Sequence, residues 1–470
     1  MPLILSNSLN ATAFARLALQ LARQGADMLL CHHNPHGGGM PHGWQVEASD
    51  TPHHAHPCCI IGLHPQRELV ITPTTPDTAL HHFCFGDTSC HADLTLGFLS
   101  YPLGLLRHGI ATSKDNALPL GTLRTYQSLL RWYPHNATLT LATAADSPPD
   151  AAQSLQALLA AWQTHQPATD GLPPELTHPL PPASALPQSL DRKGYMRGVT
   201  SVLQHISKGN TYQLNLTSSF GLHVPGLDAP AFFLRRWLAR PVPHAGFFHC
   251  GPYRIISFSP ERFLHVAKGE VRTMPIKGTR QLPPQGTPPA ATGHPNCTEA
   301  RLRAELMADP KERAELSMVV DLLRNDISTT CAYGSVRVTR HCEVFRVGRL
   351  LQMFSEVRGT LAPEHTCLDL LFSAFPGGSV TGCPKPRTME IIDSLEPHSR
   401  EVYCGTLLAI ADAHTMDSSI AIRTGWYDTR TGALTFPAGS GLTVDSCPAD
   451  EYDEAVAKTA AFREPWLPKG

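Results

Sequence analysis

The sequence predicts a mixed α/β protein that contains substantial antiparallel β-sheet, and two neighbouring patterns support this class. Between Asp191 and Gly209, apolar residues recur three and four positions apart, which is the spacing of one face of an amphipathic helix. Residues 211–220 then alternate apolar and polar side chains, as a half-buried strand does. Strand and helix patterns continue to follow one another toward the C-terminus, which is typical of a mixed α/β fold.

The composition sets limits on the class of function. The chain has 470 residues, 42% of them hydrophobic, which suffices to bury one large core or two ordinary ones. The formal net charge is −2 and there is no stripe of basic residues, so we expect no binding to nucleic acid. The sequence also has no run of about 18 apolar residues, so we expect no membrane span. Small anionic substrates need only a few local cations and are not excluded.

Cysteine usage and the N-terminus predict a cytoplasmic protein. The 13 cysteines are odd in number, none are spaced as Cys-x-x-Cys, and Cys58 and Cys59 are adjacent. This usage is typical of reduced thiols and fits neither a disulfide framework nor a zinc knuckle. The first 25 residues lack a basic segment before their apolar start and contain Arg16 and Arg23. They therefore predict an amphipathic helix and not a signal peptide.

Three segments are predicted along the chain. Residues 1–165 form an N-terminal region rich in His, Pro and Ala. Residues 166–188 are dense in proline, which removes backbone donors and disfavours helix at the preceding residue, so they predict an extended connector. The more regular residues 189–466 form the second predicted domain.

A cluster of histidines in the N-terminal region allows two interpretations. A histidine-rich tract could bind a metal, whereas a chain with 25 histidines also places them freely in polar loops. We favour the polar loop, because no pair combines a helical ligand spacing with an acidic partner. The cluster comprises His32, His33, His36, His42, His53, His54 and His56.

Residues 257–280 contain the first candidate catalytic groups. A strand pattern ends in a turn and places Glu261 just past it. A second strand pattern ends at Pro275, and Lys277 follows, directly before a glycine. Burial would disfavour the charged form of Lys277, and the charge of Arg280, if close, would act in the same direction, so the amine could be neutral near pH 7. On position alone, a solvated lysine at a strand end is the favoured interpretation.

Two predicted helix starts each carry a pair of carboxylates. Asp309 is the predicted N-cap of one helix, and Glu312 and Glu315 follow it. A second helix start carries Glu451 and Glu454, again three residues apart. Together the two pairs could bind a hard divalent cation such as Mg²⁺, which takes one or two carboxylates plus substrate oxygens. Taken alone, Glu312 is a natural capping glutamate and either pair would be a solvated helix face.

Glycines in the C-terminal part and one arginine predict contact with a ligand. Glycine permits close approach of the backbone to a ligand, and the alternative is a set of tight turns. Arg423 lies in a predicted apolar strand, where its guanidinium suits a carboxylate or, alternatively, a buried structural ion pair. The glycines are Gly377, Gly378, Gly382, Gly405, Gly439 and Gly441.

Residues 190–463 resemble the family of chorismate-utilising enzymes, which includes anthranilate, aminodeoxychorismate, isochorismate and salicylate synthases. Five separated motifs occur in the order of the family, among them SPERF at 259–263 and PIKGT at 275–279. The resemblance implies two α/β lobes of antiparallel sheet packed face to face, with helices outside. It also implies that residues 1–165 correspond to the N-terminal half of anthranilate synthase component I, and residues 189–466 to the chorismate-binding catalytic domain.

The resemblance implies a role for each candidate residue. Glu261 resembles the general acid that protonates the leaving C4 hydroxyl of chorismate. Glu315 and Glu454 resemble the ligands of a Mg²⁺ cofactor, and Glu312 and Glu451 resemble the second member of each pair. The residues implied to bind the substrate are Tyr403, Arg423, Gly439, Gly441, Thr279 and Gly378.

Two positions indicate the branch of the family. Gln213 stands where isochorismate and salicylate synthases have a lysine that activates water, which places the chain with the ammonia-using enzymes. Lys277 stands where anthranilate synthases have alanine, and it resembles the nucleophile of aminodeoxychorismate synthases. The resemblance thus implies that Lys277 attacks C2 of chorismate and that ammonia then attacks C4. The product would be 4-amino-4-deoxychorismate, a precursor of p-aminobenzoate and folate.

The resemblance also bears on partners and alternatives. The sequence contains no glutaminase motif, so a separate glutamine amidotransferase subunit is implied as the source of ammonia. Gln352 replaces a histidine that matters for aromatisation, Ser440 replaces the usual Gly or Ala, and bound tryptophan is not expected. The nearest alternative is an anthranilate or 2-amino-2-deoxyisochorismate synthase. A more distant one is an inactive relative that binds metal or acts as a scaffold.

Overall fold

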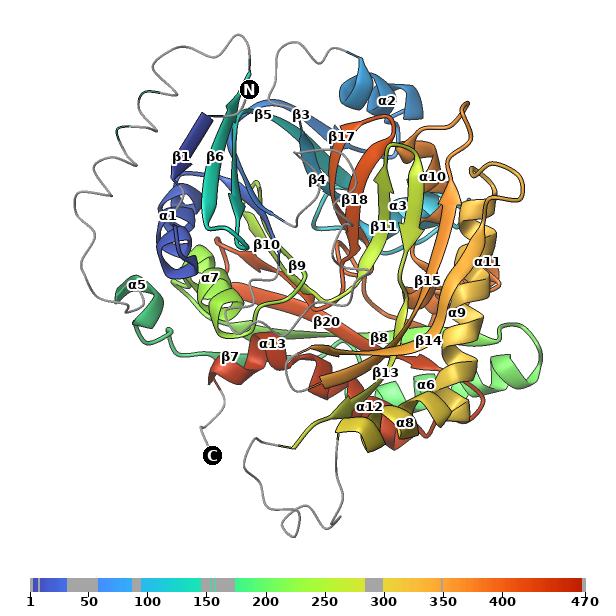
Figure 1. The fold of residues 1–470 in the computed structure, drawn as a ribbon. Helices are drawn as coiled ribbons and strands as arrows, with labels where there is room; N and C mark the ends of the chain where they lie inside the picture. The colour runs from blue at the N-terminus through green and yellow to red at the C-terminus, as the bar shows by residue number, and fades with distance from the viewer. Residues whose placement is uncertain are drawn as a thin grey trace.

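The computed structural model describes residues 3–6, 9–31, 58–86, 94–144, 153, 157, 174–283, 299–347 and 350–466. The strands of this part of the chain form one continuous antiparallel network (Figure 1). At its centre, β5 (Gly121–Tyr133) joins two arms, because β3 (Cys59–Ile71) and β4 (Thr95–Leu99) both pair with it. β6 (Thr138–Thr143) extends the network from β5 to β1 (Leu3–Ser6).

One arm runs from β3 to β8 and carries Gly439 and Gly441 on its strand β20. In order of pairing, its further strands are β2 (Asp27–Leu30), β9 (His244–Cys250), β10 (Tyr253–Ser259), β19 (Thr424–Asp428), β20 (Ala433–Leu442) and β8 (Gln213–His223). The other edge of β8 pairs with β7 (Ser184–Leu186) and β16 (Gly382–Cys383). β7 and the short helix α5 (Pro174–Thr177) belong to the described part of the predicted proline-rich connector.

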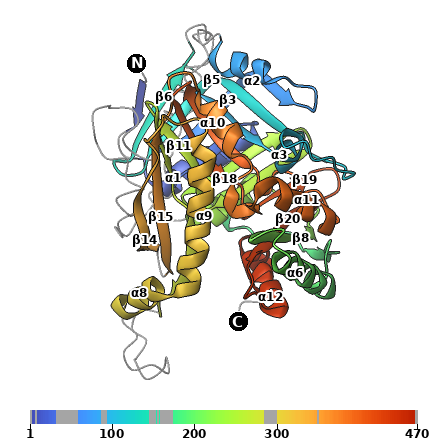
Figure 2. The ribbon, with the colours of Figure 1, turned by 90° about the vertical axis from the view of Figure 1, so that its right-hand side faces the viewer.

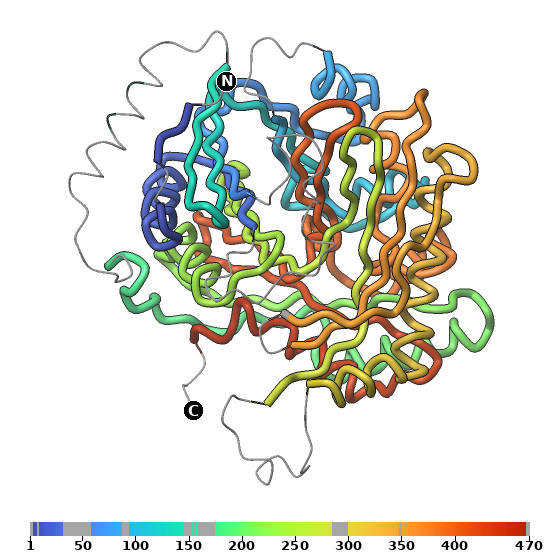
Figure 3. The backbone as a smooth tube through the Cα atoms, in the orientation of Figure 1, coloured from blue at the N-terminus to red at the C-terminus, as the bar shows by residue number. Residues whose placement is uncertain are grey.

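The other arm runs from β4 to β13 and carries Lys277. In order of pairing, its further strands are β17 (Thr406–Asp412), β18 (Thr415–Ile420), β11 (Arg262–Ala267), β12 (Glu270–Thr273) and β15 (Leu350–Thr360), with β13 (Ile276–Gln281) and β14 (Arg337–Val347) also paired to β15. The backbone trace shows the blue and teal N-terminal strands directly beside red C-terminal ones (Figure 3). Both predicted domains therefore contribute to one sheet, and their boundaries stay a prediction.

Helices cover the sheet on its outer faces. They are α1 (Ala11–Arg23), α2 (Asp77–Phe85), α3 (Tyr101–Arg107), α6 (Arg192–Ser207), α7 (Ala229–Ala239), α8 (Glu299–Ala308), α9 (Pro310–Ser328), α10 (Cys367–Ala374), α11 (Lys385–Leu395), α12 (Pro448–Lys458) and α13 (Ala460–Arg463), with single turns η2 (Gly378–Val380) and η3 (Glu464–Trp466). The long helix α9 stands against β14 and β15, while α6 and α12 lie side by side next to β8 and β20 (Figure 2).

The two helix starts predicted from capping residues form as expected. The carboxylate of Asp191 accepts a hydrogen bond of 2.7 Å from the backbone N–H of Gly194 at the start of α6. Asp309 accepts from the backbone N–H groups of Lys311 and Glu312 at the start of α9. These bonds satisfy donors that the first turn of a helix leaves without a partner, so each helix begins where the sequence predicts.

Buried apolar side chains gather on both arms of the sheet. One large cluster surrounds Phe14 and Trp132, whose rings stack 4.5 Å apart, and another surrounds Phe263 and Leu371. The predicted class is confirmed, because the protein is a mixed α/β fold with a large antiparallel sheet and helices. Within the described ranges, no helix is long and apolar enough to cross a membrane. The histidine cluster of residues 32–56 lies outside the described residues.

Candidate active site

Lys277 is the second residue of a new strand, β13, which begins just after the expected strand end at Pro275. β12 ends at Thr273, and β13 begins at Ile276 and pairs with β15, so that Lys277 lies opposite Met353 and Thr279 opposite Gln352. Gly278 is the extra residue between these pairs, with a φ of +69° that favours glycine. The bulge keeps β13 paired with β15 on both sides of Gly278.

The side chain of Lys277 bridges the two arms of the sheet. A Cβ atom built on Gly441 of β20 would lie 3.2 Å from the Nζ atom of Lys277. Gly439 is two residues away, and a Cβ atom there would lie 2.0 Å from the carbonyl oxygen of Leu216. The amine of Lys277 therefore occupies space that exists because β20 carries glycine at position 441.

Glu261 is a buried carboxylic acid near the Lys277 amine. It lies between β10 and β11 and is 7% exposed, and its carbonyl oxygen accepts a hydrogen bond from the backbone N–H of Ile420. Burial raises the pKa of its carboxyl to about 7, although the positive charges of Lys277 and Lys458 act in the opposite direction. At neutral pH the carboxyl is thus present partly in its protonated form, as a general acid requires.

The Ser379 hydroxyl is a second polar group beside Glu261. It lies close enough to favour the charged carboxylate, but its oxygen is buried without a partner that meets hydrogen-bond geometry. It therefore remains available as a donor next to the acid.

The first acidic pair lies on α9 beside β13. Glu312 does not close a capping box with Asp309, because its carboxylate lies 3.5 Å from the guanidinium of Arg280 and near Gly278. Arg280 also forms an ion pair of 2.7 Å with Asp309. The capping interpretation of Glu312 is therefore wrong, and the charge of Arg280 is directed at these two carboxylates.

The second acidic pair faces the first from α12. Burial raises the pKa of the Glu315 carboxyl, although the positive charge of Lys277 acts to lower it. The nearby negative charges of Glu312 and Glu451 raise this pKa further. Glu451 is 7% exposed, and its Oε2 atom is buried with no hydrogen-bond partner. Burial would also raise the pKa of Glu454, but its ion pair of 2.6 Å with Lys458 leaves that pKa lowered.

The four carboxylates on α9 and α12 form the candidate cation site. No three His, Cys, Asp or Glu side chains in the described ranges lie close enough together to hold a metal. Two observations nevertheless suit a hard cation: the unpaired oxygen of Glu451, and the charges of Glu312 and Glu451, which add to the effect of burial in raising the pKa of Glu315. The donor set is made of oxygen atoms and fits Mg²⁺, so the four residues stay a predicted metal site.

Arg423 lies in a bend before β19 and not inside a strand. Its φ of +50° interrupts the extended backbone, and its carbonyl oxygen accepts a hydrogen bond from the backbone N–H of Phe258. The side chain is exposed to solvent, yet enough protein surrounds it that burial lowers its pKa, while Tyr403 nearby acts in the opposite direction. In the described structure the guanidinium has no ion pair or side-chain hydrogen bond, so a structural ion pair does not explain this residue.

The remaining substrate candidates differ in their surroundings. Tyr403 is buried in the turn after Arg400, with 4% of its surface exposed, and Thr279 is exposed on β13 two residues after Lys277. Gly378 begins η2, where a Cβ atom would lie 2.5 Å from the side chain of Leu322 on α9. Packing against a helix explains this glycine, so contact of its backbone with a ligand stays a prediction.

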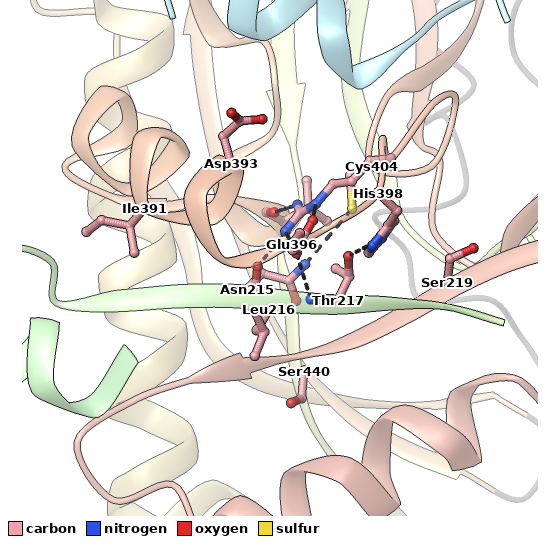
Figure 4. Close-up of polar contacts among 12 residues, drawn as sticks. Asn215, Leu216, Thr217, Ser219, Ile391, Asp393, Glu396, His398, Cys404 and Ser440 are labelled. Carbon is pink, nitrogen blue, oxygen red and sulfur yellow. Dashed lines mark hydrogen bonds and ion pairs between the residues drawn. The ribbon is translucent and has the colours of Figure 1, made fainter. Parts of the chain in front are cut away.

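A buried ion pair behind β8 was not predicted from the sequence. Arg400 donates to Glu396 at 2.7 and 2.9 Å and to the carbonyl oxygen of Asn215, while Glu396 accepts from the backbone N–H of Thr217 (Figure 4). Both side chains are 1% exposed. The four-residue spacing of Glu396 and Arg400 is a signal only within a helix, and these residues lie outside one, so the pattern did not reveal the pair.

Comparison with known proteins shows the family of the chain. A family model described as chorismate binding enzyme matches residues 50–464. Anthranilate synthase component 1 of Bacillus subtilis is 34% identical over 288 residues, which are 61% of this chain and 53% of that protein. Aminodeoxychorismate synthase component 1 of Klebsiella aerogenes is 37% identical over 278 residues, which are 58% of each protein. The chain thus matches between half and three fifths of the length of these relatives, and identity does not separate the two kinds of synthase.

The solved structures show the same fold. Anthranilate synthase component I from Streptococcus pneumoniae TIGR4 superposes with a TM-score of 0.72 at 24% identity, covering 91% of this chain and 94% of that one. MenF, the menaquinone-specific isochorismate synthase from Escherichia coli, superposes with a TM-score of 0.65 at 16% identity, covering 97% and 99% of the two chains. On its sequence and its fold, the chain belongs to the family of chorismate binding enzymes.

Proposed function

We propose that this chain aminates chorismate at C4 and forms 4-amino-4-deoxychorismate, the precursor of p-aminobenzoate and thereby of folate. The observation that carries the proposal is Lys277, whose Nζ atom lies against Gly441 and within electrostatic range of Glu261. A lysine amine and a protonatable carboxylic acid at one site can act as nucleophile and general acid.

The proposed reaction has two balanced steps. The neutral amine of Lys277 attacks C2 of chorismate, the ring double bond shifts, and the C4 hydroxyl leaves as water with a proton from Glu261. Ammonia then attacks C4, the double bond shifts back, the bond from C2 to Lys277 breaks to release the neutral amine, and one proton of the new C4 ammonium group returns to Glu261. The sum is exchange of a hydroxyl for an amino group, with water as the second product.

The carboxylates of chorismate need cationic or N–H partners. Arg423 offers an exposed guanidinium without a protein partner, and Tyr403 lies near it. The backbone from Gly439 to Gly441 lies beside the Lys277 amine and offers N–H groups without interference from side chains. Thr279 lies two residues from Lys277 on the same strand, and its exposed hydroxyl can contact the substrate from β13.

The four carboxylates of α9 and α12 would hold the Mg²⁺ ion. Glu315 and Glu454 are the proposed ligands, with Glu312 and Glu451 as the second member of each pair. When bound, the cation supplies positive charge that neutralises a substrate carboxylate and the acidic pairs. Lys458 positions this region, because its amine pairs with Glu454 and donates to the carbonyl oxygen of Gly439 at 3.1 Å.

We further propose that ammonia comes from a separate glutamine amidotransferase subunit. Both curated relatives carry "component 1" in their names, which supports a second component for this chain as well. The isolated chain should use ammonium salts, preferably at alkaline pH, where more of the ammonia is uncharged. It should use glutamine only after a glutaminase subunit is added.

Formation of anthranilate is the second candidate, because a relative of that activity is 34% identical to this chain. The two functions are separated by analysing the product made from chorismate, Mg²⁺ and ammonium by chromatography and mass spectrometry. We expect a product that keeps the pyruvyl group and carries an amino group in place of the hydroxyl. Aromatic anthranilate, released together with pyruvate, would contradict the proposal.

A further inference from the structure

Tyr195 of α6 lies in the interior between two strands and a neighbouring helix. Its side chain is fully buried, and its ring meets the ring of Tyr452 on α12 edge to face at a centroid distance of 5.7 Å. Its hydroxyl oxygen lies 2.9 Å from the carbonyl oxygen of Leu216 on β8. It also lies 3.0 Å from the hydroxyl of Ser440 and 3.1 Å from the backbone nitrogen of Ser440 on β20.

The donors and acceptors of this group can be assigned fully. A carbonyl oxygen only accepts, so the single phenol proton of Tyr195 goes to Leu216. The phenol oxygen then accepts twice, from the backbone N–H and from the hydroxyl proton of Ser440. Burial raises the pKa of the Tyr195 phenol, which keeps this proton in place. All three hydrogen-bonding positions of the phenol are used.

The register of β20 directs Ser440 away from the Lys277 amine. Gly439 and Gly441 are paired with Thr217 and Asn215, so these positions share one face of the sheet with Lys277. Side chains alternate along a strand, and Ser440 therefore points to the opposite face. Figure 4 shows Ser440 on the side of β8 away from Glu396 and His398. The Ser440 hydroxyl does not face the Lys277 side of the sheet, so it neither crowds a carboxylate there nor bonds to one.

We infer that Tyr195 is a positioning residue, which holds the backbone of Ser440 and thereby sets where Gly439 and Gly441 present their N–H groups beside Lys277. The inference rests on the proposed binding of chorismate by this segment. Because Tyr195 holds β8 and β20 at the same point, loss of its hydroxyl frees the segment to shift without removing any group that touches the substrate.

The test is isothermal titration of chorismate into the purified chain with Mg²⁺ and without ammonium, which gives the dissociation constant and the binding-competent fraction separately. Tyr195→Phe should raise the dissociation constant about threefold to tenfold, the effect of one neutral hydrogen bond. A purely structural role would lower the competent fraction and leave the dissociation constant unchanged. Tyr452→Phe is the matched control, because its hydroxyl donates to Gln188 at 2.9 Å and not to a residue of β20.

A double variant separates positioning from folding. In Tyr195→Phe the buried hydroxyl of Ser440 loses its acceptor, so adding Ser440→Ala should recover part of the urea midpoint. The dissociation constant should stay raised in the double variant, because the backbone N–H of Ser440 still lacks the phenol oxygen of Tyr195 as its acceptor. Wild-type affinity in Tyr195→Phe, or its return in the double variant, would overturn the inference. Titration without ammonium is independent of the product, so an unexpected product would refute the proposed reaction while leaving this result intact.

Discussion

The Nζ atom of Lys277 lies 3.2 Å from the position that a Cβ atom of residue 441 would occupy, so the lysine of one sheet arm fits against the glycine of the other. β13 and β20 belong to different arms of the sheet, which are joined through β5. The candidate site therefore forms only when both arms have folded.

Replacement of Gly441 by alanine should impair the reaction while leaving the fold intact. The added methyl group would meet the flexible end of Lys277, which can move aside at little cost in stability. A displaced reacting atom lowers the rate of the chemical step, so we expect kcat to fall about tenfold or more. Steady-state rates and urea unfolding measure the two effects.

Gly439→Ala provides the contrast in the same strand. Its methyl group would lie 2.0 Å from the backbone oxygen of Leu216, which cannot move without disturbing the sheet. This variant should lose stability as well as activity. Wild-type turnover in Gly441→Ala would show that the position of the amine beside β20 does not matter.

Replacement of Glu261 by glutamine should stabilise the fold more at pH 8 than at pH 5. The folded-state pKa of about 7 lies above the ordinary value of 4.5, so the native state binds this proton more tightly than the unfolded chain. The contribution of the acid to stability is present below pH 4.5 and is lost as the pH rises to 7. A neutral glutamine avoids that loss, which is worth about 3 kcal/mol at pH 8.

Urea unfolding at both pH values measures this difference. Glu343→Gln is the control, because Glu343 is exposed on β14 and loses little solvation on folding. The expected pattern is a gain at pH 8 for Glu261→Gln alone. An equal effect at both pH values would mean that Glu261 is not the buried acid described here.

Removal of divalent cations should abolish turnover of chorismate. Without a cation, the carboxylates of α9 and α12 repel one another, and EDTA should therefore stop the reaction until Mg²⁺ is restored. Glu315→Gln and Glu454→Gln should each lower activity by about two orders of magnitude. Asp321→Asn, on the exposed face of α9, should keep wild-type dependence on Mg²⁺. Full activity in EDTA would refute the metal assignment.

Local features of the chain were predictable because neighbouring residues determine them. The pattern between Asp191 and Gly209 corresponds to α6, and the alternation in residues 211–220 corresponds to the first part of β8. Asp309 caps α9 as its side chain predicts. In each case the periodicity or the cap acts within a few residues, which is the range over which a sequence pattern carries information.

Features that depend on distant pairing were not predictable in the same way. A new strand, β13, begins directly after Pro275 because residues 276–281 pair with β15, and the bulge at Gly278 arises from that pairing. The positive φ of Arg423 likewise interrupts a stretch of residues whose apolar pattern predicts a continuous strand. The direction of Ser440 follows from the register of β20 against β8, which no local pattern specifies.

The central claim, covalent catalysis by Lys277, is tested most directly by Lys277→Ala in an assay of product formation from chorismate, Mg²⁺ and ammonium. The variant keeps Glu261, the acidic pairs and Arg423, so it should still bind chorismate. Formation of 4-amino-4-deoxychorismate should fall at least about 100-fold, and Lys277→Arg should do no better, because a guanidinium stays protonated. Peptide mass spectrometry should find an adduct on Lys277 in the wild-type protein alone. A Lys277→Ala variant that forms 4-amino-4-deoxychorismate at the wild-type rate would contradict the account.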